Sequence, residues 1–486
     1  MAQAPRAGAR VVPITAVAND AAGEIVSMFQ AEAKIQSRAV SGRFATWRWA
    51  LVWLTQLVFY GLPWLTWNGR PAMLFDLGER RFYVFNLLLY PQDFIYLTAL
   101  LVISAFGLFL FTAVAGRLWC GYTCPQTVYT EIFMWVEQRC EGDRNARLKL
   151  DAAGWSLKKL RQRGTKHVLW LLIGLWTGFT FVGYFTPIRD LWAATLGFAL
   201  GPWELFWILF YGLATYGNAG FLREQVCKYM CPYARFQGVM FDPDTLVISY
   251  DPARGEPRGS RPRSTAHAAL PAAGKGDCID CTLCVQVCPT GIDIREGLQI
   301  ECIGCAACID VCDSVMDKMD YPRGLIRYAT QREMESGARE HLSLRHLLRP
   351  RVLIYGAILL AIGGAFVASL WLREPLRIDV VRDRGALARL VQDGRIENSY
   401  SVQLMNNTEA ALPVSLGVRG IPGAEAQVRG ALVLAPAESR WVPVAVQVPP
   451  EAAQTLGAGA HPIEFVVSLD PGRAPVVEKS TFVVPR

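Results

Sequence analysis

The chain has 486 residues, of which 52% are hydrophobic and 19% are charged, and its formal net charge is +7. This composition is too apolar for a typical soluble protein and too charged for one that lies wholly within the bilayer, and the length allows two or three domains. A positive charge can indicate nucleic-acid binding, but the location of the basic residues argues against it here, because most of them flank hydrophobic segments, as in oriented membrane proteins.

Five apolar stretches follow an N-terminal segment, residues 1–46, that has no apolar signal-peptide core and is expected to be a cytoplasmic lead-in. Each stretch is long enough to cross a hydrocarbon layer of about 30 Å. The expected membrane helices span about residues 47–67, 94–115, 168–188, 196–215 and 352–372. The first four would form a transmembrane region over residues 47–218. Pro202 and Glu204 interrupt the fourth stretch, and we expect them near the far interface.

Basic residues beside these stretches predict the orientation of the chain. They are frequent before the first stretch, between the second and third, and after the fourth, and sparse between the first two. Cytoplasmic loops carry an excess of Lys and Arg. The N-terminus and residues 219–350 are therefore expected in the cytoplasm, and residues 373–486 outside. That outer segment alternates as strands do, with turn residues such as Asn406 and Asn407, and it predicts a β-sandwich.

The strongest motif is a tandem cysteine pattern within residues 270–325. The spacing C-x2-C-x2-C-x3-C-P runs from Cys278 to Pro289, and C-x2-C-x2-C-x3-C follows from Cys302 to Cys312. This is the spacing of a bacterial ferredoxin with two [4Fe–4S] clusters, in which the fourth cysteine of each run ligates the other cluster. The expected ligands are Cys278, Cys281, Cys284 and Cys312 for the first cluster, and Cys288, Cys302, Cys305 and Cys308 for the second.

A pair of zinc sites is the alternative, but zinc ligands usually come as two C-x2-C pairs for each ion. Asp313 stands where many ferredoxin motifs have a second proline, so the turn geometry there is expected to differ. The ferredoxin domain would be joined to the membrane region by a connector at residues 219–269 and by a linker at residues 326–350.

Two further cysteine pairs have the form C-x3-C-P. Cys120 and Cys124 precede Pro125, and Cys227 and Cys231 precede Pro232. Each pair follows an apolar stretch that runs inward, so the first four stretches resemble a duplicated two-helix unit. Both pairs are expected at the cytoplasmic edge of the membrane, beside the ferredoxin domain.

Proline starts helices well, which places Cys124 and Cys231 near a helix N-terminus, where the dipole would lower a thiol pKa. Such soft ligands prefer Cu(I), so a copper or redox-thiol site is the first interpretation. Structural cysteines, a disulfide, and a further cluster bound by all four thiols are the alternatives. Met230 could add a thioether ligand, and Cys140 is expected to be an ordinary thiol.

Several cofactor motifs are absent from the sequence. Only His167 borders an apolar stretch, so paired haem ligands are not expected, and no C-x-x-C-H motif, Gly-rich dinucleotide loop or P-loop occurs. Electrons are therefore expected from a partner protein, a quinol or a small reductant, and not directly from NAD.

Longer stretches carry a family resemblance. They include SGRFATWRW, AGRLWCGYTCPQT, YGNAGFLREQVCKYMCPYARFQ, GDCIDCTLCVQVCPTGIDIR and ECIGCAACIDVCDSVMDKM. From about Val40 to its end, the chain resembles the cytochrome c oxidase accessory proteins of the CcoG (FixG/RdxA) family. The resemblance implies an α-helical protein of the bacterial inner membrane with five transmembrane helices, an inserted two-cluster ferredoxin domain and a periplasmic immunoglobulin-like domain.

The resemblance also implies an activity. The family reduces Cu(II) to Cu(I) on the cytoplasmic side and supports assembly of cbb3-type oxidase, passing Cu(I) to copper chaperones or transporters. Carried over by motif, Cys120, Cys124, Cys227 and Cys231 would be the candidate copper or redox cysteines. The electron donor is unknown, and the chain could form a homodimer. A quinol-linked electron conduit to a partner reductase and a non-enzymatic assembly factor for the oxidase are the alternative functions.

Overall fold

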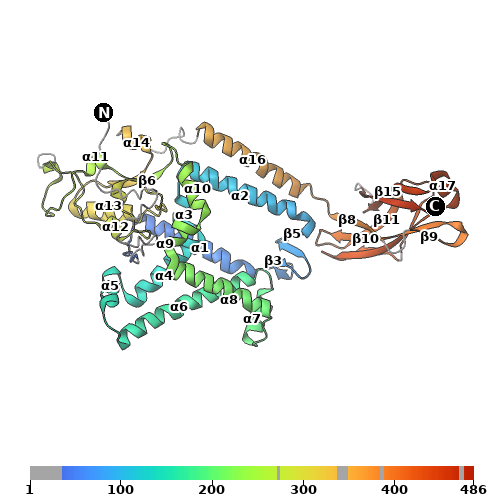
Figure 1. Ribbon diagram of the computed structural model, residues 1–486, viewed down its shortest axis with the longest axis horizontal. Coiled ribbons are helices and arrows are strands. Elements are labelled where there is room, and N and C mark those ends of the chain that lie inside the picture. The colour runs from blue at the N-terminus through green and yellow to red at the C-terminus, as the bar shows by residue number, and fades with distance from the viewer. Residues whose placement is uncertain are drawn as a thin grey trace, which may run out of the picture. The chain divides into compact units, whose positions relative to one another are not determined.

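The computed structural model describes residues 35–270, 274–336, 348–383, 388–428, 430–469 and 475–485 (Figure 1). Most of the expected lead-in, residues 1–46, and much of the linker at 326–350 lie outside the described residues. The described chain contains long apolar helices, a small cysteine-rich unit and a C-terminal pair of β-sheets.

Four helical segments among the described residues are long and apolar enough to cross a membrane. They are Pro91–Ala115, Leu157–Val182, Pro202–Met230 and Pro350–Trp371. The first contains α2 (Phe94–Ala115), the second is α6 (Leu157–Val182), the third begins with α8 (Pro202–Gly217), and the fourth is α16 (Pro350–Trp371). Four of the five expected membrane segments therefore have a counterpart.

The bounds of these helices differ from the expected ones. The helix α6 begins eleven residues before the predicted start at 168, because its first turns are basic and amphipathic and not apolar. Residues 196–201 are not part of α8, since the short helix α7 (Ile188–Leu196) ends there and a new helix begins at Pro202. Proline is favoured at the first position of a helix, which accounts for the restart.

The first expected membrane segment, residues 47–67, is not among those four. Its helix, α1 (Arg43–Gly61), begins earlier and ends earlier than predicted. The polar side chains of Arg48 and Gln56 lie within it and lower its mean hydropathy. A count of five membrane helices is thus not confirmed by length and composition.

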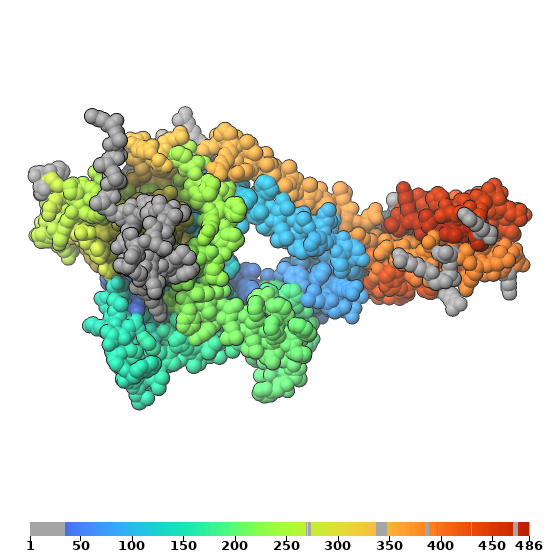
Figure 2. Space-filling view, viewed as in Figure 1, coloured from blue at the N-terminus to red at the C-terminus, as the bar shows by residue number. Residues whose placement is uncertain are grey.

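Two helix pairs show how the apolar segments associate. Between α6 and α8, the backbones approach so closely that a Cβ at Gly178 would lie 2.2 Å from the Ile208 carbonyl oxygen. Small residues permit such close packing of helices in membranes. The helices α2 and α16 lie side by side (Figure 1, Figure 2), and the Tyr96 and Phe366 rings meet edge to face between them at 6.0 Å.

A cysteine-rich unit surrounds α12 (Leu283–Gln286) and α13 (Ala307–Met319). Its antiparallel strands β6 (Val247–Tyr250) and β7 (Ile326–Ala329) come from segments that were assigned to the connector and the linker. Ile248, Met316 and Ile326 form part of its core. The unit is therefore larger than the predicted 270–325, because two flanking strands are needed to close it.

The C-terminal region is a sandwich of two antiparallel sheets. One has the strand order β12-β14-β10-β8 with β9 beside β10, and the other has the order β13-β11-β15-β16. The strands are β8 (Leu376–Arg382), β9 (Arg389–Leu390), β10 (Ile396–Asn406), β11 (Leu412–Arg419), β12 (Glu425–Gln427), β13 (Leu432–Leu434), β14 (Ser439–Val448), β15 (Gly459–Ser468) and β16 (Val476–Val484). Tyr400, Leu404, Phe465 and Phe482 fill the core between the sheets. The predicted β-sandwich is confirmed.

A hairpin region between α1 and α2 contacts this sandwich. The strands β3 (Met73–Asp76), β4 (Arg81–Val84) and β5 (Leu87–Leu89) form an antiparallel sheet. Leu88 and Tyr90 pack against Met405 of the sandwich. Asp93, just before α2, forms an ion pair of 2.8 Å with Arg377.

Candidate iron–sulfur and cysteine-pair site

The cysteines assigned to the first cluster line one cavity of the ferredoxin unit, called here the first cavity. Two come from the loop that leads into α12, one lies in α12 itself, and the fourth, from the second motif, lies in α13. They are Cys278, Cys281, Cys284 and Cys312. The remaining walls are mostly apolar and include Val315 and Met316, with the guanidinium of Arg295 at one side.

The cysteines assigned to the second cluster line a second cavity. They are Cys288, Cys302, Cys305 and Cys308. Cys284 also lines this cavity, so the two spaces are neighbours. Each space thus has three cysteines of one motif and the last cysteine of the other, which is the arrangement that the crossed spacing predicts.

The backbone between these cysteines turns in a way that favours a compact cofactor. Thr282, Gly304 and Ala306 all have positive φ angles, of 56°, 72° and 61°. All three lie between consecutive cysteines, where left-handed residues reverse the chain locally. Gly304 is also closely approached by the Arg117 carbonyl oxygen, at 3.0 Å from an added Cβ. The four thiols of each cavity, with apolar walls behind them, fit a polynuclear iron–sulfur group.

Burial dominates the electrostatics of these thiols. Desolvation raises the pKa of Cys284 and of Cys305 to about 11, although Arg295 and Arg48 respectively oppose the shift. A thiol of that kind is neutral near pH 7 without a metal, and binding of a metal displaces its proton. Among the described residues, no three Cys, His, Asp or Glu side chains lie close enough to bind a single metal ion.

Asp313, which was expected to alter a turn, lies inside a helix instead. The helix α13 continues through this residue to Met319. The Asp313 carboxylate accepts a hydrogen bond of 3.0 Å from the Gly324 N–H, and so joins α13 to the segment that precedes β7.

The first C-x3-C-P pair lies on a short helix after α2. Gly116, with φ of 55°, ends α2, and Cys120 lies in α3 (Leu118–Tyr122). Cys124 is the N-cap of α4 (Pro125–Glu141), as predicted from Pro125. Its pKa is nevertheless raised and not lowered, because burial outweighs the hydrogen bonds from the backbone N–H groups of Gln126 and Thr127.

The second pair lies on a direct continuation of α8. Two π-helical stretches, η3 (Asn218–Leu222) and η4 (Val226–Met230), flank α9 (Arg223–Gln225) and carry the helix through Cys227. Cys231 is the N-cap of α10 (Pro232–Met240). The sequence placed this motif in a connector after the membrane helix, but the structure places it at the helix end. π-Helical insertions are frequent at functional sites.

The structure brings the two pairs together. The Cys120 thiol donates a hydrogen bond of 3.3 Å to the Gln237 side chain of α10, which follows the second pair. Burial, and then the nearby Cys124 and Cys231 thiols, raise the pKa of Cys120 to about 11. Cys120 and Cys227 both pack against an apolar cluster that contains Cys305 of the second cavity.

A backbone contact joins α3 to the second cavity. A Cβ at Gly121 would lie 2.7 Å from the Gly304 carbonyl oxygen and 2.8 Å from the Cys305 nitrogen. Arg117 donates hydrogen bonds to the carbonyl oxygens of Ile300 and, on α10, Ala234. The ferredoxin unit and both cysteine pairs therefore form one continuous site.

The N-terminus of α1 also contacts the ferredoxin unit. The Asp310 carboxylate accepts hydrogen bonds from the backbone N–H groups of Phe44, at 3.1 Å, and Ala45, at 2.7 Å. Arg48 donates to the Cys305 carbonyl oxygen at 2.7 Å and forms an ion pair of 3.2 Å with Glu131 of α4. The sequence alone does not predict these contacts. The one feature of the sequence that points to them is the presence of charged residues, such as Arg48, within otherwise apolar segments.

A buried ionic network fixes the helices around the pairs. Glu137 of α4 forms ion pairs with Arg147 of α5 (Arg144–Ala152) at 2.8 Å and with Arg223 of α9 at 3.0 Å. Lys166 of α6 pairs with Glu141 at 2.7 Å. Removing one partner of a buried pair leaves an uncompensated charge, so the network holds these elements in one arrangement.

Three other residues were named from the sequence, and the structure describes the surroundings of each. Met230 is 60% exposed. Cys140 packs beside Phe133 in an apolar cluster. The His167 Nδ1 atom lies 3.0 Å from the Tyr216 hydroxyl.

Comparison with known proteins identifies three regions. Residues 222–331 match a 4Fe–4S dicluster domain, residues 97–140 match a 4Fe–4S binding domain, and residues 366–485 match the Ig-like fold at the C-terminus of FixG. The chain is therefore an iron–sulfur electron-transfer protein, and its apolar helices indicate a membrane protein.

Relatives match over most of the chain. The nitrogen fixation protein FixG of Rhizobium meliloti is 37% identical over 463 residues, which cover 88% of this chain and 87% of FixG. Protein RdxB of Cereibacter sphaeroides is 42% identical over 400 residues, covering 81% and 83%. Protein RdxA of the same organism is 37% identical over 403 residues, covering 81% and 84%. With this identity over this length, the chain belongs to the FixG/RdxA family.

Proposed function

We propose that this protein reduces Cu(II) to Cu(I) with electrons that pass through its ferredoxin unit. The observation that carries the proposal is the contact of α3 with the second cavity. Gly121, next to Cys120, packs on the backbone of Cys305, so the paired thiols adjoin a cluster ligand. Thiolates favour Cu(I) over Cu(II), and binding at these thiols therefore makes reduction easier.

The chain's own residues have distinct parts in this reaction. The eight ferredoxin cysteines would hold two [4Fe–4S] clusters, which supply one-electron transfer when bound. Cys120, Cys124, Cys227 and Cys231 would bind copper as the substrate. Arg48 and Arg117 bind backbone carbonyls around the second cavity and place positive charge there, which favours the more negative, reduced state of this site.

The topology of α1 supports five membrane crossings. The N-terminus of α1 contacts Asp310 of the ferredoxin unit. The segment after the C-terminus of α2 contacts Gly304 of the same unit, so these two helix ends lie on the same side. The C-terminus of α1 is joined to the start of α2 by the hairpin that meets the sandwich. The 19 residues of α1 rise about 28 Å, close to the hydrocarbon thickness. This topology agrees with a cytoplasmic ferredoxin unit and a periplasmic sandwich in a bacterial inner membrane.

The family supplies the proposed use of the product. Cu(I) made at the cytoplasmic edge would pass to a copper chaperone or transporter for assembly of cbb3-type oxidase. The outer sandwich, anchored by Asp93 and Met405 to the start of α2, would then be the part that meets assembly factors.

Serine variants of the paired cysteines test the proposal. Protein with both clusters is reduced with dithionite, freed of excess reductant, and mixed with Cu(II) in the presence of a Cu(I)-specific chelator. Cys120→Ser and Cys227→Ser are expected to abolish formation of Cu(I) while leaving the visible cluster absorption intact. Cys140→Ser, which lies in another apolar cluster, is the matched control. Unchanged copper reduction in the first two variants would contradict the role of the pairs.

A second candidate is a further iron–sulfur cluster bound by the four paired thiols. The match of residues 97–140 to a 4Fe–4S binding domain favours it, since that range contains Cys120 and Cys124. Iron analysis of anaerobically purified protein separates the two candidates. A third cluster would raise the iron content by half, and Cys120→Ser would remove that extra iron.

A further inference from the structure

A wide apolar groove lies between α1, α4 and α6. Its volume is about 780 Å³, and Trp49, Trp53, Gln56, Tyr60, Trp135 and Trp176 are among the residues that line it. Trp53 is 63% exposed, so the groove is open on one side. Trp176 lies on α6, one of the helices able to cross a membrane, and the open side would therefore face lipid.

The Gln56 side chain, which lines this groove, carries a buried oxygen without a hydrogen-bond partner. The side chain of Gln56 is on a residue only 9% exposed, and its Oε1 atom has no hydrogen-bond partner. Buried polar atoms in proteins nearly always have a partner, and those without one call for an explanation. A ligand that carries a hydroxyl group at this position would satisfy the Gln56 oxygen.

The aromatic walls specify the rest of the ligand. Four tryptophans surround the space, and their faces and edges suit a flat ring. The exposed side suits a long apolar tail, because lipid would surround whatever emerges there. A lipid acyl chain would fill the same volume, but it has no hydroxyl group for Gln56 and no ring for the tryptophans.

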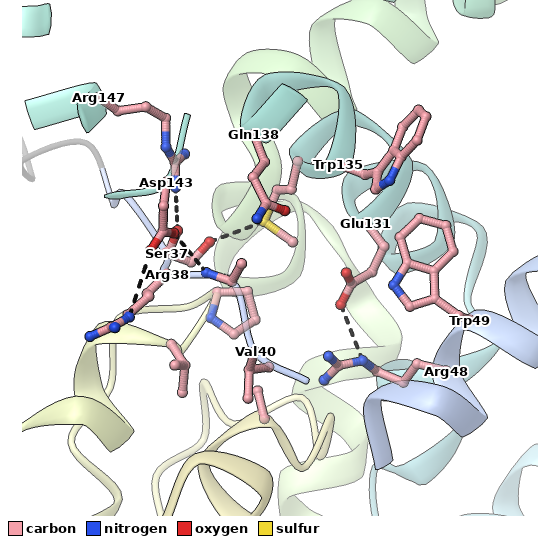
Figure 3. A pocket seen from close by; sticks show the side chains of 15 residues that line it. Ser37, Arg38, Val40, Arg48, Trp49, Glu131, Trp135, Gln138, Asp143 and Arg147 are labelled. Carbon is pink, nitrogen blue, oxygen red and sulfur yellow. Dashed lines mark hydrogen bonds and ion pairs between the residues drawn. The ribbon is translucent and has the colours of Figure 1, made fainter. Parts of the chain in front are cut away.

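Two consecutive residues of α1, Arg48 and Trp49, connect the groove with the second cavity. Trp49 and Trp135, whose rings lie 6.5 Å apart, also line a polar cavity of about 90 Å³ (Figure 3). Arg48, next to Trp49, donates to the Cys305 carbonyl oxygen at 2.7 Å. Glu131, its ion-pair partner, faces the polar cavity.

We propose that the groove binds a membrane quinol, the electron donor of this protein. The inference rests on the proposed electron-transfer function and supplies its missing reductant. On oxidation, both O–H bonds of the quinol break, and it becomes a quinone with loss of two electrons and two protons. Two one-electron steps deliver the electrons through the ferredoxin unit to two Cu(II) ions, which become Cu(I). The protons leave through the polar cavity beside Glu131, which is large enough for water.

Photolabelling tests binding without any turnover. Full-length protein in nanodiscs is irradiated with a short-chain benzoquinone that carries an azide, and labelled peptides are identified by mass spectrometry. We expect label on α1 and α6, and at least a tenfold decrease when unlabelled decylubiquinone is added in excess. Label that spreads equally over α2 and α16, or that the quinone does not displace, would show partition into lipid and overturn the proposal.

Cluster reduction by decylubiquinol and by a short-chain naphthoquinol tests the donor role, with no copper present. Gln56→Leu is expected to slow reduction by the effective quinol at least tenfold at subsaturating concentration, and Trp53→Leu several-fold. The controls are Thr98→Val on α2 and Trp203→Leu on α8, both away from the groove. Equal rates in Gln56→Leu, Trp53→Leu and the wild type, or no reduction by either quinol, would refute the inference.

Copper reduction started with dithionite separates this inference from the function on which it rests. It should be the same in Gln56→Leu and in the wild type, because dithionite does not need the groove. If wild-type protein that has been reduced with dithionite does not reduce Cu(II), the proposed function is refuted. If quinol does not reduce the clusters but dithionite-reduced protein still reduces Cu(II), only the proposed quinol site is refuted.

Discussion

The two C-x3-C-P motifs share a backbone design and differ in what lies between their cysteines. In both, the second cysteine is the N-cap of a helix whose first residue is proline. Gly121 and Tyr122 follow Cys120, whereas Lys228 and Tyr229 follow Cys227. Tyr122 is 7% exposed, but Tyr229 is 60% exposed. The tyrosine at the same position of the motif is thus buried in the first copy, which lies in the α-helix α3, and exposed in the second, which lies in the π-helical stretch η4.

Under the proposed function, this difference predicts separate tasks for the two copies. Only the first motif carries a glycine that lets its helix touch the backbone of Cys305. The second motif is continuous with the helix that began at α8, and it reaches the first through Gln237. We therefore expect electrons to arrive at the first motif, and the second motif to complete the proposed copper site.

The largest effect is expected from Gly121→Val. Its side chain would overlap the backbone of Gly304 and Cys305, which cannot move without disturbing the second cavity. We expect a loss of roughly 3 kcal/mol in stability, the upper end for overpacking. Iron content and the temperature at which cluster absorption disappears measure this effect, and copper reduction should fall with them.

Lys228→Val at the equivalent position of the second motif is the matched control. It should keep the full iron content, since this position is not in backbone contact with a cluster ligand. If both variants lose iron equally, or neither does, the two motifs are not distinguished by docking on the ferredoxin unit.

A smaller effect is expected from Tyr122→Leu. The ring of Tyr122 is buried, so its replacement by the smaller leucine leaves a cavity in the protein. The ring of Tyr229 is exposed, so the same replacement there leaves no cavity. We expect a cost of about 2 to 3 kcal/mol for Tyr122→Leu and within about 0.5 kcal/mol for Tyr229→Leu. Thermal loss of the cluster spectrum checks both. Equal costs would mean that Tyr122 contributes little to the interface.

Much of the ferredoxin site could be predicted because its information is local. The spacing from Cys278 to Cys312 implies that cysteines of both motifs share each cavity, and the two cavities have that composition. Proline after Cys124 and Cys231 likewise predicts where helices begin. The hydrophobic alternation after residue 373 was sufficient for the β-sandwich.

Contacts between distant segments could not be predicted in this way. Nothing near Asp310 indicates that its carboxylate binds the N–H groups of Phe44 and Ala45, because the partner is another part of the chain. The raised pKa of Cys124 follows from burial, which local sequence does not report. The bounds of β6 and β7 depend on a pairing across the whole ferredoxin unit.

The next smaller effect concerns the residue that links both motifs to the second cavity. Arg117 donates to a carbonyl oxygen of the ferredoxin loop from one guanidinium nitrogen and to a carbonyl oxygen of α10 from the other. The single nitrogen of a lysine ammonium group cannot occupy both of these positions. Arg117→Lys should therefore cost about 1 to 2 kcal/mol. Because the charge remains, the potential of the second cluster should change little, whereas Arg117→Met should lower it. Redox titration followed by spin resonance measures both, and equal potentials in Lys and Met variants would contradict an electrostatic role.

The smallest effect is expected from Tyr122→Phe. The Tyr328 hydroxyl donates to the Gly304 carbonyl oxygen at 2.7 Å, so it must accept from Tyr122 in their long contact of 3.4 Å. Loss of Tyr122 Oη removes only this weak bond, and we expect a cost below about 1 kcal/mol. Tyr328→Phe leaves the Gly304 carbonyl without its side-chain donor and should cost more. A thermal shift for Tyr122→Phe as large as that for Tyr328→Phe would contradict the view that the 3.4 Å contact is weak, and would make the Tyr122 hydroxyl a major polar link between the first motif and the second cavity.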